Sequence, residues 1–197
     1  MKTVNIQTVS SEFSDNITEI EAYTERCNQV FADEKKYLSY CYENAIIMVY
    51  KAFEQFVLRS MIACLNHDHS YFQEKHGIKL GKHINDDVCE FLITKGGFFD
   101  FKGRDGLCKA LNSMIGPNHN IAIIFKKTKY KDAIEQLCTI RNYAAHNSIQ
   151  SKRAVLKAFN LQRISSAGSF LKQQHRFENI VGKLLELAED IKNTPLQ

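Results

Sequence analysis

Proline and glycine are scarce in this chain of 197 residues, which holds two prolines and nine glycines. Such a composition excludes collagen-like, proline-rich and linker-rich architectures. Because proline and glycine interrupt helices and strands, their scarcity favours long uninterrupted elements. Apolar residues make up 44% of the chain and charged residues 24%. These fractions are typical of a globular protein and not of a disordered one.

Long apolar runs and paired cysteines are also missing. No stretch approaches the roughly 18 consecutive apolar residues of a membrane span, so we expect no membrane partner. The first residues, MKTVNIQTVSSEF, contain one lysine and no apolar segment, which is not the pattern of a secretory signal. No C-x-x-C pair occurs, so we expect reduced, mostly buried thiols in a cytoplasmic protein. The cysteines are Cys27, Cys41, Cys64, Cys89, Cys108 and Cys138.

Neither sign of charge dominates, since the chain has 26 Lys and Arg and 22 Asp and Glu, for a net charge of +4. This balance permits an anionic partner without requiring one. A DNA-binding domain usually carries a compact basic recognition helix, and no such arginine cluster stands out here.

Apolar residues recur at steps of three and four, which is the spacing of helices. We therefore predict an all-α, single-domain helical bundle over residues 1–197, with its core in 10–192 and an insertion at about 67–105. Residues 1–9 and 67–82 are predicted to lie outside helices, and 121–125 is left unassigned. The predicted helices are 10–31, 34–65, 85–95, 105–115, 130–146, 151–159 and 169–192.

The helix at 34–65 is apolar on most of its circumference, which predicts a central position in the fold. We expect one core in which this helix meets the helices at 130–146 and 169–192. Its predicted members are Ile46, Val49, Phe53, Phe56, Val57, Ile134, Leu137, Val181 and Leu184.

Two sequence patterns contain residues of ligand-binding type, but neither has the spacing that a known site requires. The segment GGFFDFKGRDG lacks the spacing of a phosphate-binding loop and follows no predicted strand. Five zinc-type ligands fall within twenty residues, but their spacing matches no usual zinc site. We predict no cofactor and no metal, with these residues as the open alternative: Cys64, His67, His69, His76 and His83.

The strongest chemical candidate is the pair Arg141 and His146, with Asn142 directly after the arginine. Composition alone gives about 0.25 such R-x-x-x-x-H spacings by chance. On a straight helix the two side chains point roughly 140° apart, so one pair makes a poor compact site unless the helix end frays. The basic segment KKTKYK upstream and the small residues Ala144 and Ala145 add weight to the pair.

At RNYAAH, residues 141–146, the chain resembles the HEPN superfamily of helical domains. The segments YENAIIMVYKAFEQFV and DFKGRDGLCKALNSMIG resemble the branch called RiboL-PSP-HEPN or MAE-type HEPN, so the likeness spans about 36–147. One departure is Ser148, where HepT toxins carry a tyrosine two residues after the histidine. This serine argues against a partner antitoxin of the kind that modifies that tyrosine.

The resemblance implies a metal-independent endoribonuclease that leaves 2′,3′-cyclic phosphate and 5′-hydroxyl ends, acting as a toxin or phage-defence effector. It implies that His146 moves a proton, Arg141 holds the phosphate and Asn142 bonds the phosphate or orients the His ring. Accessory candidates are Tyr143 and Glu54. Glu54 lies in an apolar helix and is expected to pair either with Arg141 or with another arginine.

The resemblance also implies partners. We expect a homodimer whose two R-x-x-x-x-H motifs face one groove, an RNA substrate, and an antitoxin or regulatory protein. The alternative is a non-catalytic HEPN module that binds nucleotide, RNA or a protein through the same surface. RNA-binding residues are predicted in the basic segment, although each one alone also fits a solvated surface: Lys126, Lys127, Lys129 and Lys131.

Overall fold

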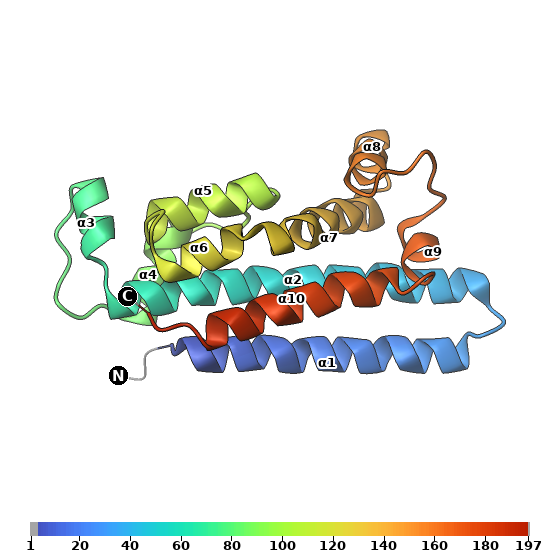
Figure 1. Cartoon of the computed structure of the whole chain (residues 1–197), viewed down its shortest axis with the longest axis horizontal. Helices are drawn as coiled ribbons and strands as arrows, with labels where there is room; N and C mark the ends of the chain where they lie inside the picture. The colour runs from blue at the N-terminus through green and yellow to red at the C-terminus, as the bar shows by residue number, and fades with distance from the viewer. Residues whose placement is uncertain (1–3, 197) are drawn as a thin grey trace. The chain divides into compact units, whose positions relative to one another are not determined.

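The computed structural model describes residues 4–196, and every regular element in that range is an α-helix (Figure 1). The prediction of an all-α protein is therefore confirmed. The helices are α1 (Ile6–Val30), α2 (Lys35–His67), α3 (Ser70–His76), α4 (Asp86–Thr94), α5 (Arg104–Met114), α6 (Asn120–Lys126), α7 (Thr128–His146), α8 (Ile149–Ala158), α9 (Ala167–Leu171) and α10 (Arg176–Lys192).

The described residues form two compact units. The first unit comprises residues 4–13, 53–127 and 187–196, and the second comprises 14–52 and 128–186. Helices α1, α2 and α10 each contribute residues to both units. The single domain and the HEPN-type architecture stay predictions.

A cluster of aromatic rings forms the core of the first unit. Phe13 of α1 stacks on Phe56 of α2 with ring centroids 4.7 Å apart. Phe53 meets Phe101 and Phe125 edge-on, at 6.0 and 6.4 Å. Such edge-to-face pairs add stability beyond the area they bury. The cluster thus holds α1, α2 and α6 of this unit together.

The second unit is held by tyrosines that are buried with a bonded hydroxyl. Tyr42 of α2 meets the ring of Phe177 of α10 at 5.6 Å and shares a hydrogen bond with Asn28 of α1. Tyr130 of α7 donates to the carbonyl of Glu186 of α10 at 3.1 Å. A buried tyrosine usually finds such a partner for its hydroxyl. These contacts connect α1, α2, α7 and α10.

The burial of the predicted core residues is confirmed, since each has at most 2% of its surface exposed. They are divided between the two units. The first unit contains Phe53, Phe56 and Val57. The second unit contains Ile46, Val49, Ile134, Leu137, Val181 and Leu184.

The first helix begins earlier than predicted. The Asn5 side chain accepts a hydrogen bond from the backbone N–H of Gln7 at 2.8 Å, as a helix-capping residue does. Ile6 and Val9 are buried. The prediction that 1–9 lie outside helices is therefore wrong from Ile6 onward, and residues 1–3 lie outside the described residues.

The segment after α2 is also more regular than predicted. Residues 70–76, expected to be a polar connection, form α3. The Asp68 side chain accepts from the N–H of Ser70 at 2.8 Å, and Phe72 is buried. Gly77 then ends the helix with φ of +65°, in the left-handed region that favours glycine.

The helices α4 and α5 begin differently. Asn85 caps α4 by accepting from the N–H of Val88 at 2.8 Å. Gly103 precedes α5, and Asp105 lies inside its first turn. A carboxylate is favourable in the first turn of a helix because it meets the positive end of the helix dipole.

The predicted helix at 169–192 is two helices. α9 ends at Leu171 and α10 begins at Arg176, with Gln174 and His175 at φ of +54° and +53° between them. Arg176 donates to the carbonyl of Phe170 at 3.1 Å, across the break. No proline or glycine marks the turn, so the local sequence carries no breaking signal.

None of the six cysteines forms a disulfide, and every one except Cys108 is buried. Burial raises the pKa of the Cys64 thiol to about 12 and that of Cys89 to about 11. Most of them are therefore small core residues, as predicted. Within residues 4–196, no helix combines the length and apolar character needed to cross a membrane.

Truncating the aromatic core should be costly. Phe53 is fully buried, so Phe53→Ala is expected to lower the free energy of unfolding by about 3–5 kcal/mol. Phe98 is fully exposed, and Phe98→Ala is the matched control, with a change within about 0.5 kcal/mol. Urea unfolding of both variants tests this. Equal stability of the two would contradict the packing described.

Glycine is required at one helix contact in the second unit. A Cβ on Gly168 would lie 1.8 Å from the backbone oxygen of Ser39, whereas a Cβ on Gly182 meets nothing within 4 Å. Gly168→Ala should therefore destabilise by about 1–3 kcal/mol. Gly182→Ala in α10 should stabilise by about 0.5–1 kcal/mol. Thermal unfolding of the two variants should move in opposite directions, and a shared direction would refute the close approach.

Candidate functional site

The candidate site lies at the C-terminal end of α7, where the chain turns sharply into α8. Asn147 adopts φ of +43° and donates its N–H to the carbonyl of Tyr143 at 3.0 Å, which ends the helix at His146. Asparagine tolerates this left-handed conformation better than most residues. Ser148 then caps α8 through a reciprocal pair of hydrogen bonds with Ser151. The serine at 148 thus has a structural task as a helix cap.

Arg141 is held in place by two neighbours. Its guanidinium carbon lies 4.2 Å from the centroid of the Tyr50 ring of α2. Its Nη1 donates to the side-chain oxygen of Asn142 at 2.8 Å. A guanidinium stacked on an aromatic face is stabilised by the ring's negative face. The cation is therefore fixed between a ring below and an amide beside it.

Most hydrogen-bond donors of Arg141 remain unassigned. A guanidinium carries five N–H donors, and Asn142 takes one of them. The Nε of Arg141 is inaccessible and has no hydrogen-bond partner among residues 4–196. A buried donor without a partner is costly. Because the Nε is closed to solvent, an anion would meet the guanidinium at its Nη atoms.

His146 is exposed at the last helical position of α7. It makes no hydrogen bond to another residue in the described part of the chain. Arg141 turns toward Tyr50 instead, so one chain does not bring the two side chains into contact. The helix stays regular through His146, and the angular separation of roughly 140° expected from the spacing applies.

Asn142 and Tyr143 have clear structural roles. The Asn142 side-chain oxygen is bonded to Arg141 and not to His146, so it steadies the cation. Tyr143 is buried, and its hydroxyl donates to the carbonyl of Ser165 at 2.9 Å. Burial raises the pKa of the Tyr143 hydroxyl. That hydroxyl is engaged in a hydrogen bond to the backbone, and the accessory role of Tyr143 stays a prediction.

Glu54, the other accessory candidate, is half-buried on α2. It belongs to the first unit, whereas Arg141 belongs to the second. Its pairing with Arg141 stays a prediction.

Two of the four predicted RNA-binding lysines make contacts within the first unit. Lys126 donates to the side chain of Asn112 and to the carbonyl of Pro117, at 3.2 and 2.6 Å. Lys127 forms an ion pair with Asp190 at 2.9 Å. These contacts give both lysines a structural role at the end of α6.

The other two lysines lie on α7 in the second unit, at the opposite end from the candidate site. Lys129 sits over the Tyr130 ring at 4.6 Å, and Lys131 is exposed. Both precede His146 by four turns or more, which is about 22–26 Å along the helix axis. One chain therefore does not place these lysines beside the candidate site.

The alternative metal ligands are dispersed. The ring of His69 is buried, with Nδ1 3.2 Å from the carbonyl of Leu65 and Nε2 3.0 Å from that of Gly81. Cys64 is buried as a thiol. Among residues 4–196, no three side chains of metal-binding type come together. His69 instead ties the loop at Gly81 to the end of α2.

Sequence reasoning missed Tyr50, the residue on which Arg141 rests. Tyr50 is 4% exposed and follows Ile46 and Val49 on the buried side of α2. Its spacing is that of an ordinary core residue. Only the tertiary packing of α7 on α2 reveals its second task.

Comparisons with family models, curated proteins and solved structures find no match for this chain. The likeness to HEPN domains therefore rests on the motif and helix order alone.

The structural role of Tyr143 can be separated from a catalytic one. Tyr143→Phe removes the hydrogen bond to Ser165 and should lower the free energy of unfolding by about 0.5–1.5 kcal/mol. Chemical denaturation measures this cost, and RNA cleavage at a temperature where the variant is folded should be unchanged. Wild-type stability with lost cleavage would instead assign Tyr143 to the chemistry.

Proposed function

We propose that this protein is a metal-independent endoribonuclease of HEPN type, in which Arg141 and His146 act on an RNA phosphodiester. One observation carries the proposal. The guanidinium of Arg141 is fixed by Tyr50 and Asn142, on the helix that ends at the exposed His146.

Arg141 supplies the phosphate contact. A planar guanidinium binds two oxygens of a phosphate through parallel hydrogen bonds, and a fixed one stabilises developing charge without reorganising. The stacking on Tyr50 leaves the edge of the guanidinium to meet those oxygens. Asn142 keeps the plane from rotating.

His146 supplies the proton transfer, because imidazole exchanges protons near neutral pH. The RNA 2′-oxygen attacks phosphorus as its proton leaves to a base. The bond from phosphorus to the 5′-oxygen breaks, and that oxygen gains a proton. The products are a 2′,3′-cyclic phosphate and a 5′-hydroxyl, and none of these reaction steps needs a metal ion.

A second copy of the chain completes the site in this proposal. Arg141 and His146 diverge by roughly 140° on one helix, so each chain presents them to different sides. Twofold dimers are the commonest assembly. In a dimer whose two α7 C-terminal ends face each other, Arg141 of one copy meets the phosphate beside His146 of the other. Such a nuclease fits a toxin or phage-defence effector under control of an antitoxin or regulatory protein.

A non-catalytic module that binds nucleotide, RNA or a partner protein is the second candidate. The observation that favours it is the isolation of His146, which has no orienting hydrogen bond among residues 4–196. Arg141 with Tyr50 would still bind a phosphate in that case.

Substitution of the pair separates the two candidates. Arg141→Ala and His146→Ala should each lower the rate of RNA cleavage by about 10²–10³ or more, measured with EDTA present. Arg141→Lys should stay impaired because an ammonium does not reproduce the two-point contact. Asn142→Ala should cost less, since it acts through Arg141.

Thermal unfolding of the same variants is the control. His146 is exposed and should be replaceable without loss of stability. Cleavage by His146→Ala at the wild-type rate would reject the nuclease and favour the binding module. Activity that disappears with EDTA and returns with a divalent ion would reject the metal-free reaction.

A mixing experiment tests the shared site. Arg141→Ala and His146→Ala chains, each inactive alone, should regain about a quarter of wild-type activity after exchange of subunits at equal concentration. Half of the dimers are then mixed, and each mixed dimer has one complete site. A site built within one chain leaves every mixed dimer without a complete pair, so no recovery would contradict sharing.

A further inference from the structure

Two neighbouring hollows lie on the second unit, and neither is lined by Arg141 or His146. One is about 450 Å³ and is lined by Arg163, Phe170 and Arg176 among others. The other is about 470 Å³ and is lined by Lys36, Tyr40 and Lys172 among others. They share Ser165, Ser169 and Gln173, so they adjoin, and the two together are here called the basic groove.

The basic groove is rich in positive charge. It is lined by five cationic side chains and one carboxylate, Glu43. Glu43 accepts the backbone N–H of Gly168 at 3.1 Å, so this carboxylate has a structural partner. The cationic residues are Lys35, Lys36, Arg163, Lys172 and Arg176.

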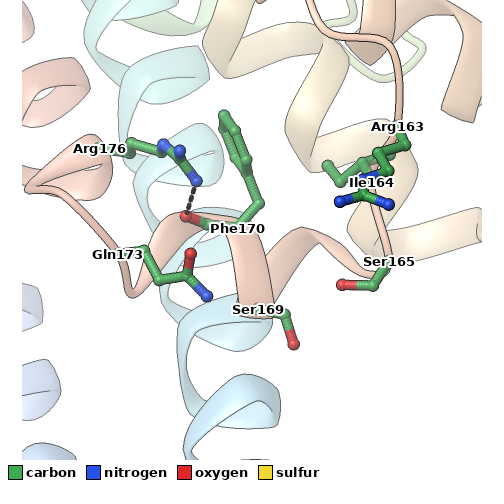
Figure 2. A pocket seen from close by; sticks show the side chains of 7 residues that line it. All are labelled: Arg163, Ile164, Ser165, Ser169, Phe170, Gln173 and Arg176. Carbon is green, nitrogen blue, oxygen red and sulfur yellow. Dashed lines mark hydrogen bonds between the residues drawn. The ribbon is translucent and has the colours of Figure 1, made fainter.

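The cations of the groove are placed differently. Figure 2 shows Arg176 and Gln173 on one side of the first hollow and Arg163 on the other, with Phe170 between them. Arg176 lies over the Phe170 ring at 4.0 Å and donates to the carbonyl of Phe170. Arg163 is exposed and has no hydrogen bond in the described residues. One cation is thus fixed and the other extends toward solvent.

One exposed tyrosine ring lines the second hollow, and a second exposed ring packs against it. Tyr37 and Tyr40 are each 53% exposed, and their rings meet edge-on at 6.5 Å. Tyr40 lines the hollow itself, with the ammonium of Lys36 5.9 Å from its ring centroid. Exposed rings beside cations are the combination that binds unpaired nucleotides, because bases stack on the rings and phosphates meet the cations.

We infer that the basic groove binds single-stranded RNA, with phosphates at Arg163, Arg176 and Lys36 and a base on Tyr40. The choice of RNA rests on the proposed function. The preference for a single strand rests on Tyr40, because a ring stacks only on a base that is not already stacked in a duplex. Cations spread over two joined hollows suit a chain of phosphates better than one small anion.

The groove is tied to the helix that carries the candidate site. The carbonyl of Ser165, in the groove wall, accepts the hydroxyl of Tyr143 on α7. Tyr143 directly follows Asn142. RNA held in the groove therefore lies against the same unit as Arg141 and His146, on a surface distinct from the predicted lysines of α7.

Binding should be measured on chains that carry His146→Ala, so that the RNA stays intact. The probe is a fluorescently labelled single-stranded RNA, followed by anisotropy over a range of salt concentrations. Arg163→Ala and Lys36→Ala should each reduce the slope of log affinity against log salt by about 0.7. Tyr40→Leu should weaken binding about fivefold or more with an unchanged slope.

Lys109→Ala is the matched control, because Lys109 is exposed on α5 in the first unit and contacts no charged partner among residues 4–196. Circular dichroism should confirm that all variants are folded. Groove variants that bind like the control would overturn the inference. Loss of binding confined to Lys129→Ala and Lys131→Ala would overturn it also, in favour of the α7 lysines. A duplex RNA that binds as tightly as the single strand would refute the role of Tyr40.

The same assay separates this inference from the proposed function. If wild-type protein does not cleave RNA while groove variants lose binding, the nuclease is wrong and the groove stands. If wild-type protein cleaves RNA and groove variants bind and cleave normally, the groove is wrong and the nuclease stands.

Discussion

The contact between the Arg141 guanidinium and the Tyr50 ring is the interaction on which the proposed chemistry depends. It joins α7 to α2 within the second unit and fixes a cation that would otherwise sample many rotamers. The same contact holds Arg141 on Tyr50 and not beside His146, which is why the proposed function adds a second copy of the chain. Asn142 restrains the plane and takes one of the five guanidinium donors, which leaves Nη donors for an anion. A guanidinium that is held in place and still has donors without a partner is ready to bind a phosphate.

Much of the fold follows from periodicity. The apolar stripes of α2 and α7 predicted both helices within a few residues, because helix burial repeats along the sequence. The break between α9 and α10 could not be predicted, since it depends on Arg176 reaching back to Phe170 and not on a local breaker. The early start of α1 depends on Asn5 as its cap, which lies ahead of the apolar stripe that marks the helix in the sequence.

Part of the candidate site can be predicted from the sequence. Spacing located Arg141 and His146, and residue chemistry suggested their roles. The partner under Arg141 was not accessible, because Tyr50 has the pattern of a core residue. The basic groove was missed as well. Its cations come from α2 and from the segment around α9, and neither stretch is unusually basic alone.

The central claim is that Arg141 and His146 cleave RNA through its own 2′-hydroxyl. It is tested most directly by mass spectrometry of the products of a defined RNA, beside the same RNA with a single 2′-deoxy nucleotide at the cleavage position. The account predicts 2′,3′-cyclic phosphate and 5′-hydroxyl ends from the first RNA and no cut at that position in the second. Cleavage that persists at the 2′-deoxy position, or products with 5′-phosphate ends, would contradict it.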